Sequence, residues 1–174
     1  MINTLTLVLG GAASGKSAFA EDLVQLIGGK RIYIATAQAF DDEMRKKISR
    51  HIAQRGDGWH TVEAPLDVPS ALRDRQPDEV VLLDCATLWL TNHMLAEHDL
   101  DAQQADLLSS LAECPCPVVV VSNEVGQGVV PDNALARRFR AAQGHLNQRI
   151  AAQSDCTVFV TAGLPQILKG ALPA

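Results

Sequence analysis

The stretch LVLGGAASGKSAFA, residues 7–20, decides how the rest of the chain is interpreted. It contains a glycine, four intervening residues, and then Gly15, Lys16 and Ser17, which is the pattern of a phosphate-binding loop. An expected strand precedes it and an expected helix follows, and this context disfavours the alternative of a glycine-rich turn with an exposed lysine. The stretch predicts a polyphosphate site but not the reaction, because kinases, switches, motors and transferases all use such loops.

The residues of this loop have distinct expected roles. Its glycines let the backbone curl so that successive N–H groups point at phosphate oxygens, and the start of the following helix adds partial positive charge. We expect Lys16 to reach the β- and γ-phosphates and Ser17 to ligate Mg²⁺. The predicted nucleotide-binding residues of the loop are Gly10, Gly11, Ala12, Ala13, Ser14, Gly15, Lys16 and Ser17.

Short apolar runs alternate with helical segments along the chain. The runs are almost continuously apolar, as in strands covered on both faces of a parallel sheet, and they span 4–9, 31–36, 80–83, 118–122 and 157–161. The expected helices span 16–27, 41–52, 101–113 and 133–152. This alternation predicts a P-loop NTPase-like α/β fold, a mostly parallel central sheet flanked by helices, with residues 1–174 as one nucleotide-binding domain. Prolines interrupt residues 61–76, which show no clear pattern.

Composition and charge narrow the classes of function. The chain is 47% hydrophobic and 20% charged with a net charge of -5, which suits an ordinary soluble protein and argues against nucleic acid as a partner. No apolar run approaches the roughly 20 residues of a membrane span, and no leader pattern is seen. The cysteines lack zinc-site spacing and are interpreted as reduced and structural. We therefore expect a cytoplasmic protein without a membrane span.

A carboxylate ends the apolar run VVLLDC, residues 80–85. Asp84 at this place would hold Mg²⁺ directly or through water, which is the second element that a phosphate-binding loop needs. An aspartate at a strand end is more often a turn or helix cap, but the loop in the same chain favours the metal role. Loop and carboxylate together fit a small-molecule kinase as well as a nucleotide-hydrolysing motor or switch.

A further group of candidates lies on the helix expected at 41–52. Met44, Ile48 and Ile52 recur every four residues, and His51, seven residues after Met44, falls at the edge of the same face and should point inward. The neighbouring cations would suit a polyphosphate; they are Arg45, Lys46, Lys47 and Arg50. On pattern alone, a half-buried structural histidine beside a solvated basic face is the better-supported interpretation.

The stretch SNEVGQGVVPDN, residues 122–133, places polar residues at the end of an apolar strand. Ligand crevices of open parallel sheets lie at the carboxyl ends of the strands, so Asn123 and Glu124 are candidates for contact with metal, nucleotide or acceptor. The alternative is a loop that enters a helix capped by Asp132 or Asn133.

Together these stretches resemble the bifunctional adenosylcobinamide kinase / adenosylcobinamide-phosphate guanylyltransferase family of cobalamin biosynthesis. The resemblance runs almost end to end, through GGAASGKS (10–17), YIATAQAFDDEM (33–44), RHIAQR…W.TVEAP (50–65), LLDCATLWLTN (82–92) and SNEVGQGVVPDNALARRFRAAQGHLNQRIA (122–151). The last stretch is long and far more specific than the phosphate-binding loop.

The resemblance implies two successive reactions. ATP or GTP would phosphorylate the aminopropanol hydroxyl of adenosylcobinamide, and GMP would then pass from GTP to adenosylcobinamide phosphate with release of pyrophosphate. The second reaction would proceed through a guanylylated histidine, and the family's histidine aligns with His51. The implied partners are adenosylcobinamide and its phosphate, with Mg²⁺ as cofactor and a homo-oligomer, a trimer by family analogy.

The resemblance also extends the set of site residues. Besides His51, Lys16 is expected to be catalytic, and Ser17 and Asp84 are expected to hold the metal. The nucleotide-binding residues outside the loop would be Arg50, Glu63, Asp84 and Glu124.

Two positions depart from the family pattern. Ala13 stands where arginine is expected, which would weaken a phosphate contact and leaves the relative kinase activity open, and Gly56 stands where proline is common. The competing hypotheses are a monofunctional P-loop kinase with a structural His51, and a nucleotide-dependent motor or regulatory switch.

Overall fold

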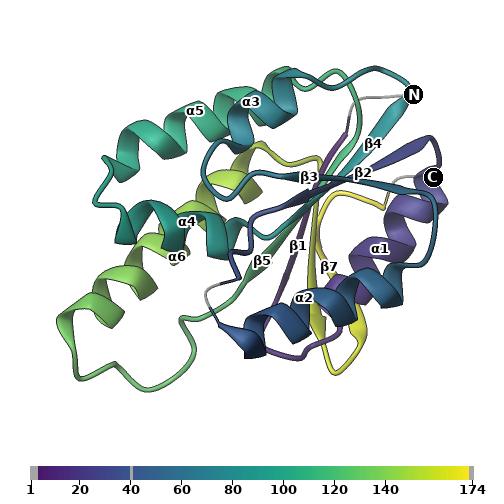
Figure 1. Ribbon diagram of the computed structural model, residues 1–174. Helices are drawn as coiled ribbons and strands as arrows, with labels where there is room; N and C mark the ends of the chain where they lie inside the picture. Colours follow the sequence, from purple (N-terminus) through teal and green to yellow (C-terminus); the bar gives the residue numbers. More distant parts are fainter. Residues whose placement is uncertain (1–3, 40, 173–174) are drawn as a thin grey trace.

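The phosphate-binding loop leaves the carboxyl end of β1 (Leu5–Gly10), a strand inside the central sheet of the molecule (Figure 1). The computed structural model describes residues 4–39 and 41–172, apart from the side chains of Lys47 and Gln54. Within these residues the sheet has seven strands in the order β3-β2-β4-β5-β1-β6-β7. The other strands are β2 (Lys30–Ala35), β3 (Trp59–Glu63), β4 (Glu79–Asp84), β5 (Val118–Asn123), β6 (Cys156–Thr161) and β7 (Leu164–Lys169).

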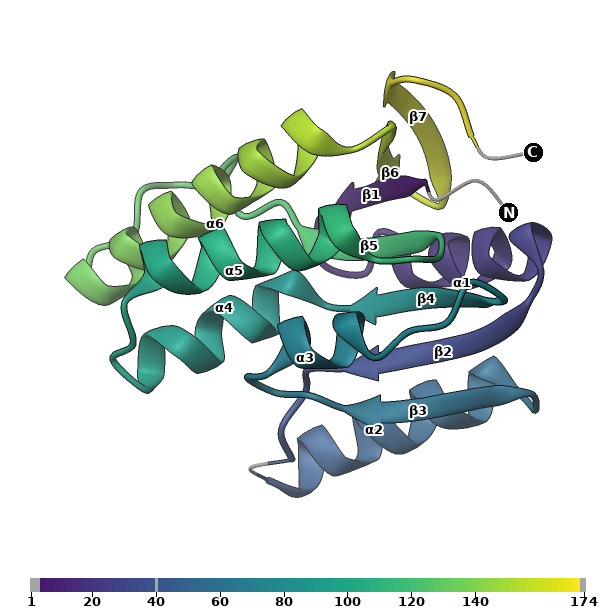
Figure 2. The same ribbon diagram turned by 90° about the horizontal axis from the view of Figure 1, so that it is seen from above.

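Every strand pair is parallel except β6 and β7, which form an antiparallel hairpin at one edge. The helices are α1 (Lys16–Ile27), α2 (Asp42–Arg55), α3 (Val68–Arg73), α4 (Ala86–Leu95), α5 (Leu100–Glu113) and α6 (Ala134–Gln153). Figure 2 shows α3, α4, α5 and α6 on one face of the sheet and α1 and α2 on the other. The predicted mostly parallel α/β fold is confirmed.

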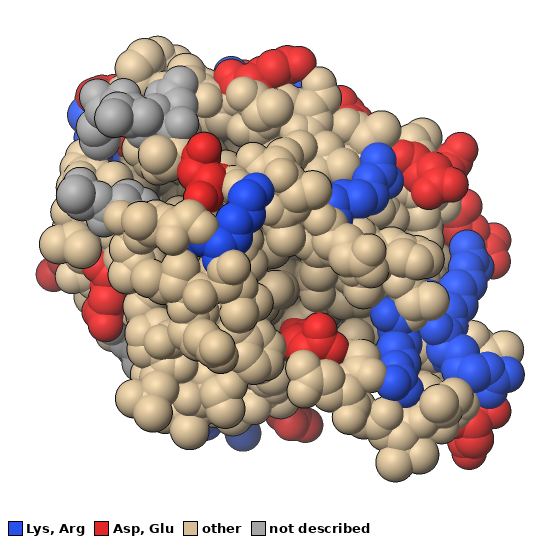
Figure 3. All heavy atoms as spheres, turned by 180° about the vertical axis from the view of Figure 1, so that it is seen from behind, with Lys and Arg blue, Asp and Glu red and all other residues tan. Residues whose placement is uncertain are grey.

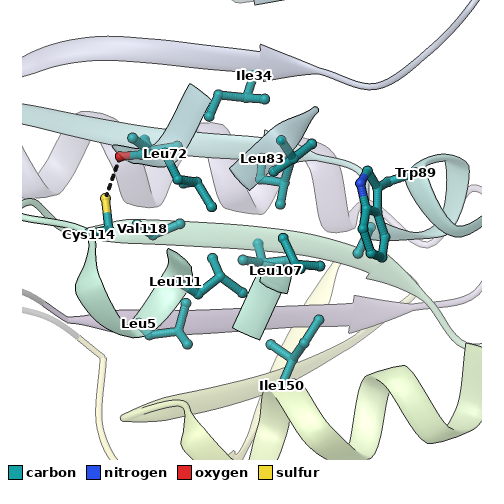
Figure 4. Close-up of a cluster of buried hydrophobic side chains, with 14 of the residues drawn as sticks. Leu5, Ile34, Leu72, Leu83, Trp89, Leu107, Leu111, Cys114, Val118 and Ile150 are labelled. Carbon is teal, nitrogen blue, oxygen red and sulfur yellow. Dashed lines mark hydrogen bonds between the residues drawn. The ribbon is translucent and has the colours of Figure 1, made fainter. Parts of the chain in front are cut away.

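Alternate residues of the strands face the two helical layers, because successive side chains of a strand point to opposite faces. Leu7, Leu83 and Val120 join the cluster under α3, α4, α5 and α6, whereas Val8 and Leu82 join the cluster under α1. Figure 4 shows the first cluster, in which the fully buried Trp89 and Leu107 meet side chains from the strands. Both faces of the sheet are therefore covered, as the continuously apolar strands predicted.

Local sequence sets the helix boundaries. Asp41 begins α2 by accepting a hydrogen bond from the backbone N–H of Met44 at 2.7 Å. Asn133 does the same for α6, accepting from the N–H of Ala136 at 2.7 Å, so Asn133 rather than Asp132 is the cap. Gly28 ends α1 with a φ of 77°, a conformation that side chains disfavour.

Several elements lie where the sequence patterns indicated none. These are the strands β3 and β7 and the helices α3 and α4. In addition, α2 continues to Arg55, three residues beyond the predicted end at 52, which brings Arg55 onto the helix. In the described part of the chain, no helix has the length and apolar character needed to cross a bilayer.

Gly10 is required by close packing at the start of the loop. A Cβ atom at this position would lie 2.8 Å from the carbonyl oxygen of Val160 and would also overlap the Ser14 hydroxyl, whereas one at Gly11 would meet nothing within 4 Å. We expect Gly10→Ala to lower the free energy of unfolding by about 1–3 kcal/mol in urea denaturation, because the backbone has to shift. Gly11→Ala is the matched control and should change it by less than about 0.5 kcal/mol. Equal stability of the two variants would contradict this packing argument.

Candidate active site

A cleft of about 280 Å³ lies beside the loop and the carboxyl ends of the strands β2, β3, β4 and β5. This is the edge of the sheet at which open parallel folds bind ligands. The predicted site residues whose side chains line the cleft are Ala12, Ala13, Lys16, Ser17, His51, Glu63 and Asp84. The structure thus brings together residues from the loop, from α2 and from two strand ends.

The loop is held by a hydrogen bond between two of its own residues and by contacts with the turn between β6 and β7. The Lys16 ammonium is almost buried, with 9% of the residue exposed, and it donates to the Gly11 carbonyl oxygen at 2.9 Å. The backbone N–H of Gly163, in the turn between β6 and β7, donates to the carbonyl of Ser14 at 2.7 Å. Gly15 has a φ of 92°, and a Cβ there would approach the Cα of Gly163 to 3.0 Å. The curled loop therefore rests against the β6–β7 hairpin.

Ala13 lies in the same loop with a φ of 54°, in the left-handed region that is uncommon for residues other than glycine. Its side chain is exposed and lines the cleft. Because a methyl group carries no charge, the side chain at this position supplies no cation to the cleft, where an arginine was expected. The structure offers no other account of this substitution.

Asp84 is held by a neighbour that the sequence patterns did not single out. The Tyr33 hydroxyl on β2 donates to Asp84 Oδ2 at 2.9 Å. Burial raises the pKa of Tyr33 well above its usual range, and the nearby Asp84 carboxylate acts in the same direction. The hydroxyl therefore stays protonated and keeps one oxygen of Asp84 in a fixed orientation.

Arg55 supplies a buried positive charge to the cleft. Its guanidinium carbon lies 3.3 Å from the centroid of the Tyr33 ring, a cation–π contact. Only 7% of the residue is exposed, and its Nη1 atom has no hydrogen-bond partner. Because burying an unpaired donor of a charged group is costly, this nitrogen points to an anionic ligand in the cleft.

Glu21 lies on α1, one turn after Ser17, and is half-buried. Burial raises its pKa to about 7; the Arg55 guanidinium opposes this shift, and the Asp84 carboxylate adds to it. Glu21 does not line the cleft, but it is close enough to Arg55 and Asp84 for their charges to act on it.

The oxygen donors Ser17 and Asp84 line one cleft, and this donor set fits Mg²⁺, which prefers oxygen ligands. Among the described residues there is no group of three or more His, Cys, Asp or Glu side chains that could hold a metal. Mg²⁺ does not need such a group, because it usually keeps several waters and binds one or two side chains together with substrate phosphates.

His51 lies on the wall that α2 contributes to the cleft and is half-buried. Met44, Ile48 and Ile52 line the cleft with it. Ile52 is nevertheless 54% exposed, and none of the three belongs to either buried apolar cluster. The apolar stripe of α2 therefore borders an open cleft instead of packing into the core.

The basic residues near His51 lie elsewhere on the helix. Arg45 is exposed and forms an ion pair with Asp42 at 2.7 Å. Lys46 and Arg50 are exposed and do not line the cleft, and the side chain of Lys47 lies outside the described part of the structure. The cation that α2 does bring to the cleft is Arg55, whose spacing of four residues from His51 was the signal that could have indicated it.

At the end of β5, the two candidate residues Asn123 and Glu124 have different surroundings. Asn123 lines the cleft, whereas Glu124 does not and instead accepts a hydrogen bond from the backbone N–H of Gly126. A more open groove of about 640 Å³ runs between α5 and α6, and none of the predicted site residues line it. Figure 3 shows basic side chains gathered at the side of the molecule where α6 begins, a segment that carries Arg137, Arg138 and Arg140.

Comparison with known proteins gives a consistent result. Residues 6–168 match the family described as cobinamide kinase / cobinamide phosphate guanyltransferase. The bifunctional adenosylcobalamin biosynthesis protein CobP of Pseudomonas aeruginosa is 46% identical over 167 residues, covering 94% of this chain and 96% of that protein. The corresponding CobU protein of Escherichia coli is 38% identical over 176 residues, covering 92% and 97%.

Among solved structures, the RadB recombinase aligns with a TM-score of 0.50 and 19% identity over 90% of this chain and 73% of that one. At this identity the likeness concerns the fold alone, and it agrees with the phosphate-binding loop and the parallel sheet. The matches to the family and to the two bifunctional proteins carry more weight, because their sequence similarity extends over nearly the whole chain. They show that the chain belongs to the cobinamide kinase / cobinamide phosphate guanyltransferase family.

Proposed function

We propose that this kinase and guanylyltransferase transfers GMP through His51 and binds its nucleotide polyphosphate in the loop at residues 10–17. The observation that carries the proposal is one shared cleft. The side chain of His51 on α2 lines the same cleft as Lys16, Ser17 and Asp84. A monofunctional kinase has no use for an imidazole on this wall, whereas a guanylyl carrier requires one.

In the first reaction, the aminopropanol hydroxyl of adenosylcobinamide attacks the γ-phosphorus of ATP or GTP. The new P–O bond forms as the bond from the γ-phosphorus to the β-γ bridging oxygen breaks, the hydroxyl loses its proton, and a nucleoside diphosphate leaves. Lys16 neutralises charge on the transferred group, and the loop fixes the line of attack. Positioning and charge neutralisation account for most of the catalysis in such transfers.

In the second reaction, neutral His51 attacks the α-phosphorus of GTP. A P–N bond forms, the bond to the α-β bridging oxygen breaks, and pyrophosphate leaves. A phosphate oxygen of adenosylcobinamide phosphate then attacks the same phosphorus, so that the P–N bond breaks and the imidazole is regenerated. Arg55 provides fixed positive charge for the phosphates, since its Nη1 atom is buried without a partner.

Ser17 and Asp84 would hold Mg²⁺, which would neutralise negative charge on the phosphates. Tyr33 keeps one Asp84 oxygen oriented, as its 2.9 Å hydrogen bond indicates. Arg50, Glu63 and Glu124 belong to the proposed nucleotide-binding set through the family resemblance, and Glu63 lines the cleft. Nucleic acid has no part in the proposed reactions.

The proposal extends to assembly and location. Leu164, Ile167 and Leu168 on the edge strand β7 are exposed by 72%, 49% and 56%, which supports a homo-oligomer, with a trimer taken from family analogy. The adenosylcobinamide substrates and a cytoplasmic location are likewise proposed from the family.

The test uses GTP labelled at the α-phosphate. After incubation and denaturation, we expect label bound to the protein in an acid-labile, alkali-stable linkage, as for a phosphoramidate, and none when the label is at the γ-phosphate. Protein without label that still phosphorylates adenosylcobinamide would contradict the guanylyl carrier and would indicate the monofunctional kinase.

A further inference from the structure

A cluster of polar side chains lies buried behind the cleft, between β5 and two helices. Its members are Thr87 on α4, Ser122 on β5, and Gln143 and Asn147 on α6, and none is more than 8% exposed. Buried polar groups cost free energy unless they are hydrogen-bonded, so such a cluster needs a structural or functional reason. Its contacts converge on the backbone of one residue that lines the cleft.

That residue is Asn123, the last residue of β5. Its backbone N–H donates to Thr87 Oγ1 at 2.8 Å, and its carbonyl oxygen accepts from Asn147 Nδ2 at 3.0 Å. The next backbone N–H, that of Glu124, donates to the carbonyl of Gly10 at 3.0 Å. The end of β5 is thus tied to α4, to α6 and to the start of the phosphate-binding loop.

The other members of the cluster fix the orientation of Asn147. Its Oδ1 atom accepts from the Ser122 hydroxyl at 2.6 Å and from Gln143 Nε2 at 2.9 Å. With the oxygen held by two donors, the amide nitrogen has to face the carbonyl of Asn123. The side chain of Asn147 therefore cannot flip without leaving buried donors unpaired.

The order of the strands places Asn123 at a chemically important point. Strand β5 lies between β4, which ends at Asp84, and β1, which leads into the loop. Asn123 is in register with Gly10 of β1, and its side chain lines the cleft together with Lys16 and Asp84. A nucleotide held by Lys16 at its terminal phosphates and by Asp84 through Mg²⁺ would bring its γ-phosphate beside this residue.

We propose that the Asn123 side-chain amide donates a hydrogen bond to the transferred γ-phosphoryl group, and that Thr87 and Asn147 are positioning residues that hold its backbone in place. This inference rests on the proposed function, because it takes the cleft to be the site of phosphoryl transfer. A donor aimed at a group whose charge changes in the transition state acts on kcat more than on nucleotide binding.

The test compares the kinetics of adenosylcobinamide phosphorylation in matched variants. Asn123→Ala is expected to lower kcat about tenfold to a hundredfold, with the dissociation constant for the β,γ-imido analogue of ATP changed by less than about threefold. Thr87→Val, which keeps the shape but removes the acceptor, should lower kcat about tenfold. Thr87→Ser, which restores the acceptor, should recover most of it.

The control for destabilisation is Thr157→Val. Thr157 is also buried and its hydroxyl is 2.8 Å from that of Ser154, but it lies near the opposite end of the sheet. The Thr157→Val variant should keep the wild-type kcat, even though it should lose about as much thermal stability as Thr87→Val. A wild-type kcat in Asn123→Ala, or a Thr87→Val variant that behaves like Thr157→Val, would overturn this proposal alone. A wild-type protein unable to phosphorylate adenosylcobinamide would overturn the proposed function and this proposal with it.

Discussion

His51→Ala is expected to lose the protein-bound guanylyl label entirely, and guanylyl transfer should fall by at least about a thousandfold. Two other side chains of the cleft, Cys85 and Tyr33, are not suited to replace the imidazole. Burial raises the pKa of Cys85 to about 11, so this cleft thiol stays protonated at neutral pH. The raised pKa of Tyr33 keeps its hydroxyl protonated as well. Phosphorylation of adenosylcobinamide should persist, because attack on the γ-phosphorus does not use the imidazole.

The measurement is label retained on denatured protein after incubation with GTP labelled at the α-phosphate. His60→Ala is the control, because His60 on β3 is exposed and does not line the cleft. It should retain the full label. Label at the wild-type level in His51→Ala would rule out this residue as the guanylyl carrier.

Lys16→Ala is expected to lower kcat for phosphorylation by at least about a hundredfold, since the transferred group loses a cation held in the cleft. Guanylylation should also weaken if one polyphosphate position serves both reactions. The comparison is with Lys46→Ala, which removes an exposed cation of α2 that does not line the cleft.

Steady-state kinetics with adenosylcobinamide measure this effect. Because Lys16 also donates to the Gly11 carbonyl at 2.9 Å, the thermal unfolding of the variant has to be recorded at the same time. Unchanged kinetics in a folded Lys16→Ala protein would exclude the proposed role of the loop.

The sequence predicted those parts of the fold that local patterns determine. The loop motif and the continuously apolar strands were sufficient for the parallel sheet. Helix α4 was missed because it is buried on most sides, including at Thr87, Trp89 and Met94, and so shows no amphipathic period. Strand β7 was missed for the opposite reason, because all six of its residues are exposed.

The same distinction applies to the candidate site. Lys16 and His51 could be singled out because a motif, a helical face and the family resemblance pointed to them. Tyr33 could not, because its bond to Asp84 depends on β2 and β4 being neighbours, and these strands are separated in the sequence by α2, β3 and α3. Arg55 was missed because the predicted helix ended before it.

The hairpin of β6 and β7 resembles an appendage to a nucleotide-binding sheet, yet its turn supports the loop through the 2.7 Å hydrogen bond from Gly163 to Ser14. This constrains how the protein can be engineered. A truncation before Gly163 would remove a backbone donor that supports the phosphate-binding loop, although no described residue from 163 onward lines the cleft. Tags and fusion partners therefore belong beyond Lys169, where β7 ends.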